Sequence, residues 1–146
     1  MKKTLVFKTN EYLADIAVMY VKLHNLHWNV VGAEFKQMHE YLEVLYEGYA
    51  GELDKVAEVL RMDNERALAS MKNYISVSKI QEIDDTDYSV RDTIIILLND
   101  MSYMHDQAET IRSLALQEDC YSLVNLMEAE LEEYKKNIWF LNSMLR

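Results

Sequence analysis

Hydrophobic residues recur along most of this chain at spacings of three and four, the period of an α-helix with one buried face. The first run predicts a helix over residues 10–31, with Asn10 near its cap, and the second predicts a helix over 34–61. A third helix begins at Ser89 and stops before the acidic stretch 117–119. The fourth covers residues 121–145.

The pattern weakens between residues 62 and 88, where Leu68, Met71 and Tyr74 indicate one short helix inside a long crossover. The chain has no proline and only three glycines, so it carries few of the residues that strands and tight turns require. We therefore expect an all-α fold, a four-helix bundle with a short extra helix in the crossover between the second and third helices.

The net charge limits the classes of molecule that the protein is expected to bind. Fifteen Lys and Arg against 25 Asp and Glu give a net charge of −10, which repels phosphate backbones and attracts cations, although the same charge also serves solubility alone. The only basic residues close to the chain ends are Lys2, Lys3, Lys8 and Arg146. We expect direct DNA binding to be negligible.

The cysteine content and the length of the apolar runs indicate the cellular compartment. Cys120 is the only cysteine, which rules out a disulfide within the chain. The apolar residues after Lys2 and Lys3 are too few for a signal peptide, and no aliphatic run approaches the ~20 residues that span a bilayer. The expectation is a soluble, cytoplasmic protein without membrane contact.

Imidazoles and carboxylates gather around the predicted junction of the first two helices. His27 closes the first helix and His39 opens the second, so the two rings can lie near one helix–helix seam. On the second helix His39, Glu43, Asp54 and Glu58 project within about 100° of one another. Neutral imidazole together with carboxylate suits iron or zinc.

The spacing of these residues requires a second chain. Glu43 and Asp54 are separated by roughly 16 Å along a helix, whereas metal–ligand bonds measure about 2.0–2.2 Å. However, the pair His39 and Glu58 and the pair Glu43 and Asp54 are both centred between residues 48 and 49. An antiparallel, two-fold-related copy would therefore complete two identical sites, each with histidines and Glu43 from one chain and Asp54 and Glu58 from its mate.

Each residue also has a simpler explanation. Acidic helix faces are usually solvated, and His27 beside Trp28 could be a packed core residue. Only the combined spacing favours a metal site. His24 either orients a ligand, reaches the metal weakly, packs or lies at the surface, and Trp28 either intercepts oxidising equivalents or packs the helix seam. Binding of zinc or manganese, or a structural bundle without metal turnover, stays open as an alternative function.

The sequence resembles the Dps miniferritin family over nearly its whole length. The resemblance is carried by KLHNLHWNVVG at residues 22–32, by Phe35, by His39 and Glu40, and by DKVAE at residues 54–58. It implies a single ferritin-like domain over residues 1–146 that assembles with eleven copies into a hollow homododecamer. Centres at the two-fold interfaces would oxidise Fe²⁺ to Fe³⁺, usually with hydrogen peroxide, and store it as mineral, which protects against oxidative stress.

The resemblance also implies a ligand set, because the family's positions fall on His27, His39, Asp54 and Glu58. The fifth position, commonly aspartate in the family, is Glu43, whose longer side chain can still ligate directly or through water. The arginine that often follows the last glutamate is replaced by Val59. Ordinary ferritins instead carry Glu-x-x-His motifs inside each bundle, and this sequence has none.

Overall fold

The computed structural model describes residues 1–146 and confirms a four-helix bundle with a short extra helix in the crossover. The elements, in chain order, are α1 (Lys3–Asn29), β1 (Val30–Val31), α2 (Phe35–Met62), α3 (Met71–Val77), β2 (Tyr88–Ser89), α4 (Val90–Gln117) and α5 (Tyr121–Met144).

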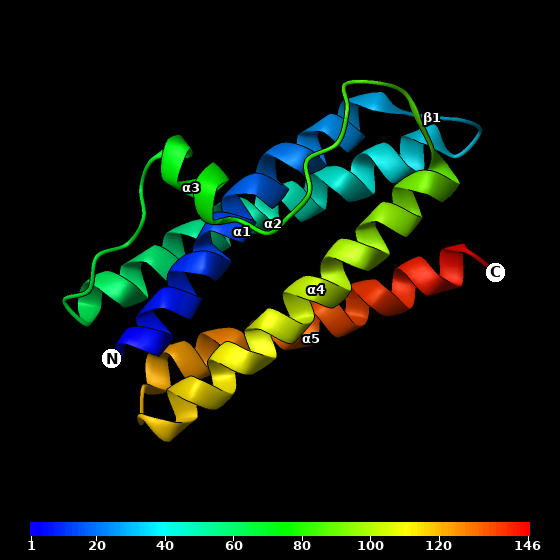
Figure 1. The fold of residues 1–146 in the computed structure, drawn as a ribbon. Helices are drawn as coiled ribbons and strands as arrows, with labels where there is room; N and C mark the ends of the chain where they lie inside the picture. Colours follow the sequence, from blue (N-terminus) through cyan, green and yellow to red (C-terminus); the bar gives the residue numbers. More distant parts are fainter.

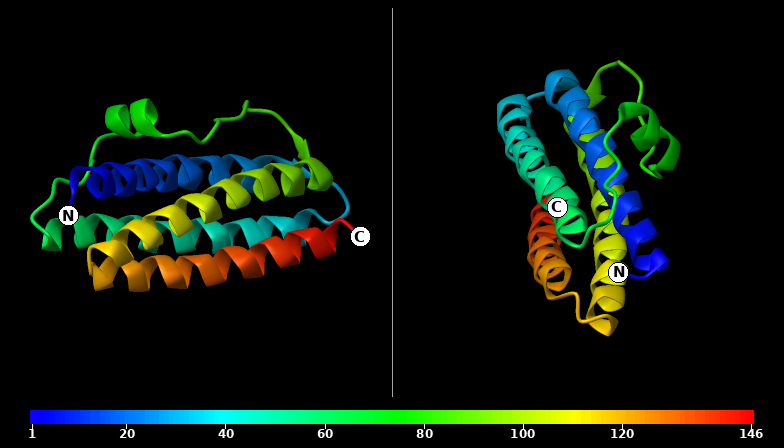
Figure 2. Two further views of the ribbon diagram at one scale, coloured as in Figure 1. Left: turned by 60° about the horizontal axis from the view of Figure 1, so that its bottom comes forward. Right: turned by 90° about the vertical axis from the view of Figure 1, so that its left-hand side faces the viewer.

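Two helical hairpins make up the bundle. The helices α1 and α2 lie side by side, as do α4 and α5, and the crossover that contains α3 runs along the outside of α1 (Figures 1 and 2). The two chain termini lie toward opposite ends of the bundle (Figure 2). None of the helices combines the length and the hydropathy needed for a membrane crossing.

Side-chain caps set the start of two helices. The Oγ of Ser89 accepts a hydrogen bond from the Asp92 amide at 3.0 Å, so the predicted start of α4 is confirmed. Ser70 does the same for α3, with the Asn73 amide 3.3 Å from its Oγ.

The predicted start of α1 is wrong. The helix begins at Lys3, seven residues before the expected cap, because Leu5 and Thr9 are buried and continue the core-facing stripe. The Asn10 side chain caps no helix. It donates to the Arg66 carbonyl at 2.9 Å and accepts from the Leu68 amide at 2.8 Å, which fastens the crossover to α1.

A two-residue parallel ladder was not expected from the sequence. Val30 is in register with Tyr88 and Val31 with Ser89, so β1 and β2 join the end of α1 to the start of α4. The chain then turns at Gly32, where φ is +128°, a backbone conformation that only glycine adopts without strain. The ladder and this turn fix the path between α1 and α2.

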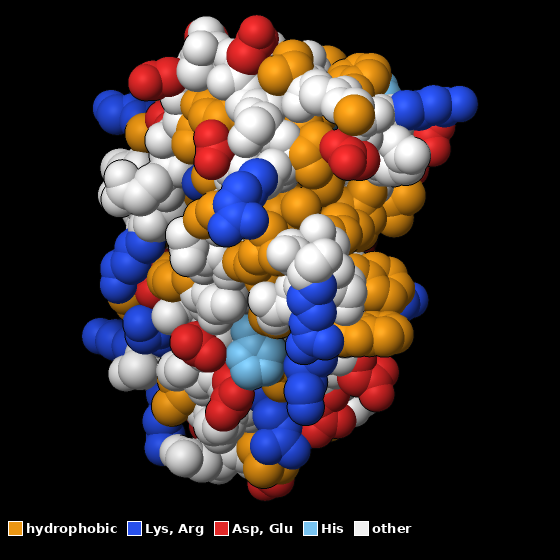
Figure 3. Space-filling model, turned by 90° about the vertical axis from the view of Figure 1, so that its right-hand side faces the viewer, with side chains coloured by type: hydrophobic (Ala, Val, Ile, Leu, Met, Phe, Trp, Pro, Cys, Tyr) orange, Lys and Arg blue, Asp and Glu red, His pale blue; other side chains and the backbone are white.

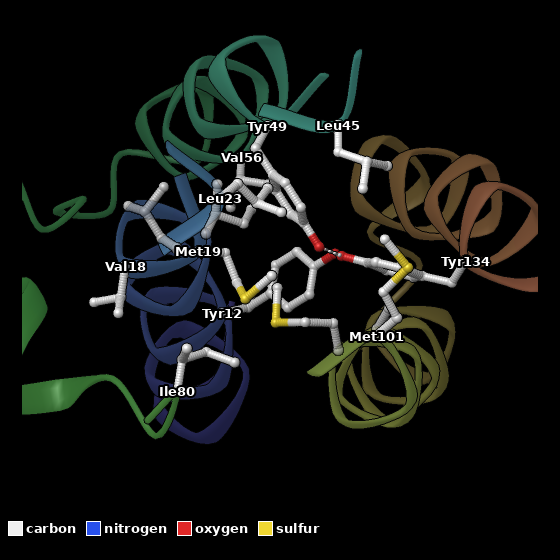
Figure 4. Close-up of a cluster of buried hydrophobic side chains, with 14 of the residues drawn as sticks. Tyr12, Val18, Met19, Leu23, Leu45, Tyr49, Val56, Ile80, Met101 and Tyr134 are labelled. Atoms are coloured by element: carbon white, nitrogen blue, oxygen red, sulfur yellow. Dashed lines mark hydrogen bonds between the residues drawn. The ribbon is translucent and has the colours of Figure 1, made fainter. Parts of the chain in front are cut away.

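The middle of the bundle contains a buried polar cluster within an otherwise apolar core (Figure 4). The hydroxyls of Tyr12 and Tyr134 lie 2.7 Å apart, and the Tyr49 hydroxyl donates to Tyr134 at 3.2 Å. Tyr12 is also 3.2 Å from the Glu130 carboxylate. Burial, followed by the proximity of Glu52, raises the pKa of Glu130 to about 9.

Apolar side chains are also left on the outside. The face in Figure 3 mixes both signs of charge with a band of hydrophobic side chains. The large apolar side chains that are more than half exposed over the whole surface are Phe7, Trp28, Val44, Met62, Met71, Ile75, Leu116, Tyr121 and Trp139. These residues are distributed over all five helices.

Candidate metal centre

Two histidines face each other across the α1–α2 seam, as the sequence predicts. The Nδ1 of His27 is 2.7 Å from the backbone oxygen of His39, and the Nδ1 of His39 is 2.7 Å from the backbone oxygen of His27. The rings stack with centroids 3.6 Å apart and planes inclined by 14°. This reciprocal pair holds both rings in one orientation.

The hydrogen bonds also decide which nitrogens are available. A backbone carbonyl can only accept, so each Nδ1 carries the proton in the neutral ring. Each Nε2 therefore keeps its lone pair and makes no hydrogen bond within the chain. A histidine oriented in this way by a carbonyl is typical of metal-binding imidazoles.

Glu43 lies beside this pair. Its Oε1 is 3.9 Å from the Nε2 of His27, too long for a hydrogen bond but short enough for both atoms to reach one ion at about 2.0–2.2 Å each. His27 is buried, His39 is half-buried, and the Glu43 side chain is 51% exposed. One side of the cluster is thus open to the surface of α2.

The two remaining predicted residues lie apart from this cluster. Asp54 and Glu58 are exposed, further along α2, and no hydrogen bond or ion pair joins either of them to another side chain of the chain. Within one chain, no group of three or more His, Cys, Asp and Glu side chains is placed to hold a metal ion. The chain alone supplies only part of a donor set.

Two glycines lie on α2 between these groups. A Cβ added at Gly48 or Gly51 would meet no atom within 4 Å, and both residues are exposed. Packing within the chain therefore gives no reason for glycine, although each glycine inside a helix costs about 1 kcal/mol relative to alanine. Glycine at this point leaves the α2 backbone accessible to close approach by another molecule.

An aromatic cluster beside the histidine pair was missed by the sequence analysis. The Tyr46 ring stacks on His24 at 3.8 Å, and its hydroxyl donates to Glu43 at 3.3 Å. The three-residue spacing from Glu43 to Tyr46 on one helix is a signal that could have indicated the contact. Trp28 does not pack into the seam, because its side chain is 69% exposed.

The residue that follows Glu58 packs inside the protein and does not reach the site. Val59 is 7% exposed and belongs to the hydrophobic core. A buried valine cannot form an ion pair, so nothing on the following residue orients the Glu58 carboxylate.

Comparison with known proteins places the chain in a family. Residues 8–146 match the model of the ferritin-like domain. The antigen TpF1 of Treponema pallidum is 31% identical over 136 residues, which cover 93% of this chain and 77% of that protein.

Solved structures agree with this match. The crystal structure of a Dps protein from Bacillus brevis superposes with a TM-score of 0.94 at 27% identity and covers 100% of both chains. The DPS protein of Vibrio cholerae O1, described as a member of the ferritin-like diiron-carboxylate proteins, gives a TM-score of 0.93 at 27% identity and covers 99% of this chain and 90% of its own. The chain belongs to the ferritin-like family and, within it, to the Dps miniferritins.

Proposed function

We propose that this protein oxidises ferrous iron with hydrogen peroxide at centres shared between two subunits and stores the ferric product as mineral. The observation that carries the proposal is the His27–His39 pair, in which carbonyls engage both Nδ1 atoms, both Nε2 atoms make no hydrogen bond, and the Nε2 of His27 lies 3.9 Å from Glu43. Asp54 and Glu58 are proposed to complete each centre from the neighbouring subunit.

Two-fold symmetry supplies the missing carboxylates. An antiparallel α2 helix crossing between residues 48 and 49 would bring the mate's Glu58 to His39 and the mate's Asp54 to Glu43. The crossing point coincides with Gly48, where the absence of a side chain permits the two backbones to approach closely. This interface accounts for a mid-helix glycine that packing within one chain does not explain.

The donor set suits the chemistry. The imidazoles hold the ferrous ion, and the carboxylates stabilise the higher charge of the ferric ion. Two ferrous ions each give one electron to hydrogen peroxide, its O–O bond breaks, and two protons complete two water molecules. Iron is both substrate and cargo in this scheme.

The biological setting is part of the same proposal. By similarity to the Dps family we propose a cytoplasmic homododecamer that limits peroxide stress by consuming both ferrous iron and hydrogen peroxide. The net charge of −10 per chain opposes direct DNA binding. A gel shift at low ionic strength without divalent metal tests this point, and strong retardation of DNA would contradict it.

Stopped-flow oxidation tests the proposed activity. The protein is loaded with ferrous iron without oxygen, and hydrogen peroxide is then added at one molecule per two iron ions. Rapid oxidation is expected in the parent protein and in Glu40→Ala, which removes an exposed carboxylate of the same helix outside the proposed set. Asp54→Ala and Glu58→Ala should lose the rapid oxidation of iron. Equal rates in all four proteins would contradict the proposal, and binding without oxidation would favour a zinc or manganese binder.

A further inference from the structure

We infer that Tyr46 is a positioning residue for the iron centre and acts by holding the Glu43 carboxylate toward His27. The inference rests on the proposed function and adds a residue that contributes no metal ligand of its own. It concerns three neighbours: Glu43, Tyr46 and His24.

Glu43 needs such a restraint. Its side chain has three rotatable bonds and is 51% exposed, so without a partner its carboxylate would spread over several rotamers in water. The Tyr46 hydroxyl donates a hydrogen bond to the Oε1 of Glu43 at 3.3 Å. That same oxygen is the one 3.9 Å from the Nε2 of His27.

Tyr46 is itself fixed from the side of α1. Its ring stacks on His24 with centroids 3.8 Å apart and an interplanar angle of 27°. The Tyr46 ring also makes T-shaped contacts with the His27 ring, with centroids 5.2 Å apart and planes at 82°, and with the Tyr20 ring, with centroids 6.1 Å apart and planes at 88°. His24 in turn donates from Nδ1 to the Tyr20 carbonyl at 2.7 Å. The hydroxyl of Tyr46 therefore occupies one place relative to the histidine pair.

The arrangement leaves the carboxylate free to bind metal. A carboxylate offers about four lone-pair sites, and the Tyr46 hydroxyl occupies one of them. A donor that orients a ligand in this way reduces the conformational freedom lost when the ion binds. The clamp of Tyr46 on His24 thus prepares Glu43 as a ligand before iron arrives.

Anaerobic titration with Co²⁺, which stays divalent and has visible d–d bands, tests the inference in the assembled protein. Tyr46→Phe keeps the ring and removes only the hydroxyl. We expect it to weaken Co²⁺ binding roughly tenfold and to shift the d–d bands. Tyr121→Phe, which removes the hydroxyl of an exposed tyrosine on α5, is the matched control and should leave both unchanged. Parent-like affinity and spectrum in Tyr46→Phe would overturn the inference.

A double-mutant cycle asks whether Tyr46 acts through Glu43. In a Glu43→Gln background, Tyr46→Phe should cause no further loss of Co²⁺ affinity. A second full tenfold loss there would show that the hydroxyl acts on the fold and would refute the positioning role. The underlying function is judged separately by His27→Ala: if this variant binds Co²⁺ like the parent, the proposed centre itself fails, whatever Tyr46 does.

Discussion

The buried Glu130 predicts that the protein loses stability as the pH rises. Burial of this carboxyl in the bundle core is the main cause of its high pKa, and the neighbouring Glu52 carboxylate adds to it. The ordinary value is 4.5 and the folded value is about 9. Between these values the native chain keeps a proton that the unfolded chain releases, so the free energy of unfolding falls with rising pH.

The size of the effect follows from that difference. One proton held only by the native state changes the free energy of unfolding by about 1.4 kcal/mol per pH unit. From pH 6 to pH 8 the contribution of Glu130 is therefore at most roughly 2–3 kcal/mol. Glu130→Gln keeps an oxygen that accepts from Tyr12 and replaces the acid with a neutral amide. The variant should lose this part of the pH dependence and be more stable than the parent protein at pH 8.

Urea unfolding followed by circular dichroism at pH 6 and pH 8 measures the difference. Protein concentration is held constant and a chelator is present, because oligomerisation and bound metal both change apparent stability. Glu132→Gln removes an exposed carboxylate of the same helix and should keep the pH dependence of the parent. Identical pH dependence in parent and Glu130→Gln would refute the assignment of a proton to the folded Glu130.

Three further substitutions test the fold and the interface. Lys22→Met removes the ammonium that lies 2.6 Å from the Asp100 carboxylate and leaves this carboxylate, which is 13% exposed, without a partner, so urea unfolding at pH 7 should show a loss of about 3–5 kcal/mol. Asp15→Ala removes the acceptor of the Ser78 hydroxyl and the Lys79 amide, and hydrogen exchange at residues 78–80 should become faster. Gly48→Leu should leave the helical circular dichroism intact but dissociate the two-fold pair in sedimentation velocity, because its side chain fills the proposed crossing point.

The long helices were predictable because their buried faces repeat with a helical period. The second helix was expected over residues 34–61 and is found at Phe35–Met62, and the last was expected over 121–145 and is found at Tyr121–Met144. The start of α1 was not predictable in the same way, because Asn10 has the chemistry of a cap. The Asn10 side chain instead forms hydrogen bonds with Arg66 and Leu68 of the crossover, which lie 56 and 58 positions further along the chain.

In the candidate site, too, local contacts were predictable from the sequence and contacts between distant residues were not. Local spacing predicted that His27 and His39 would meet across the seam, but not that each would donate to the backbone of the other. The β1–β2 ladder joins residues far apart in sequence and has only two residues per strand, too short to leave an alternating pattern. The environment proposed for Asp54 and Glu58 depends on a second copy of the chain, which no property of one helix can supply.

Mixed oligomers test the sharing of the centre most directly. A His27→Ala chain and an Asp54→Ala chain are each expected to be inactive alone. If every centre takes its histidines from one chain and Asp54 from the other, a mixed pair contains one intact centre and one doubly altered centre. Refolding the two variants together in equal amounts should therefore restore about a quarter of the parent's peroxide-driven iron oxidation. A mixture with no more activity than the separate variants, although mass spectrometry shows that mixed pairs have formed, would contradict the shared centre.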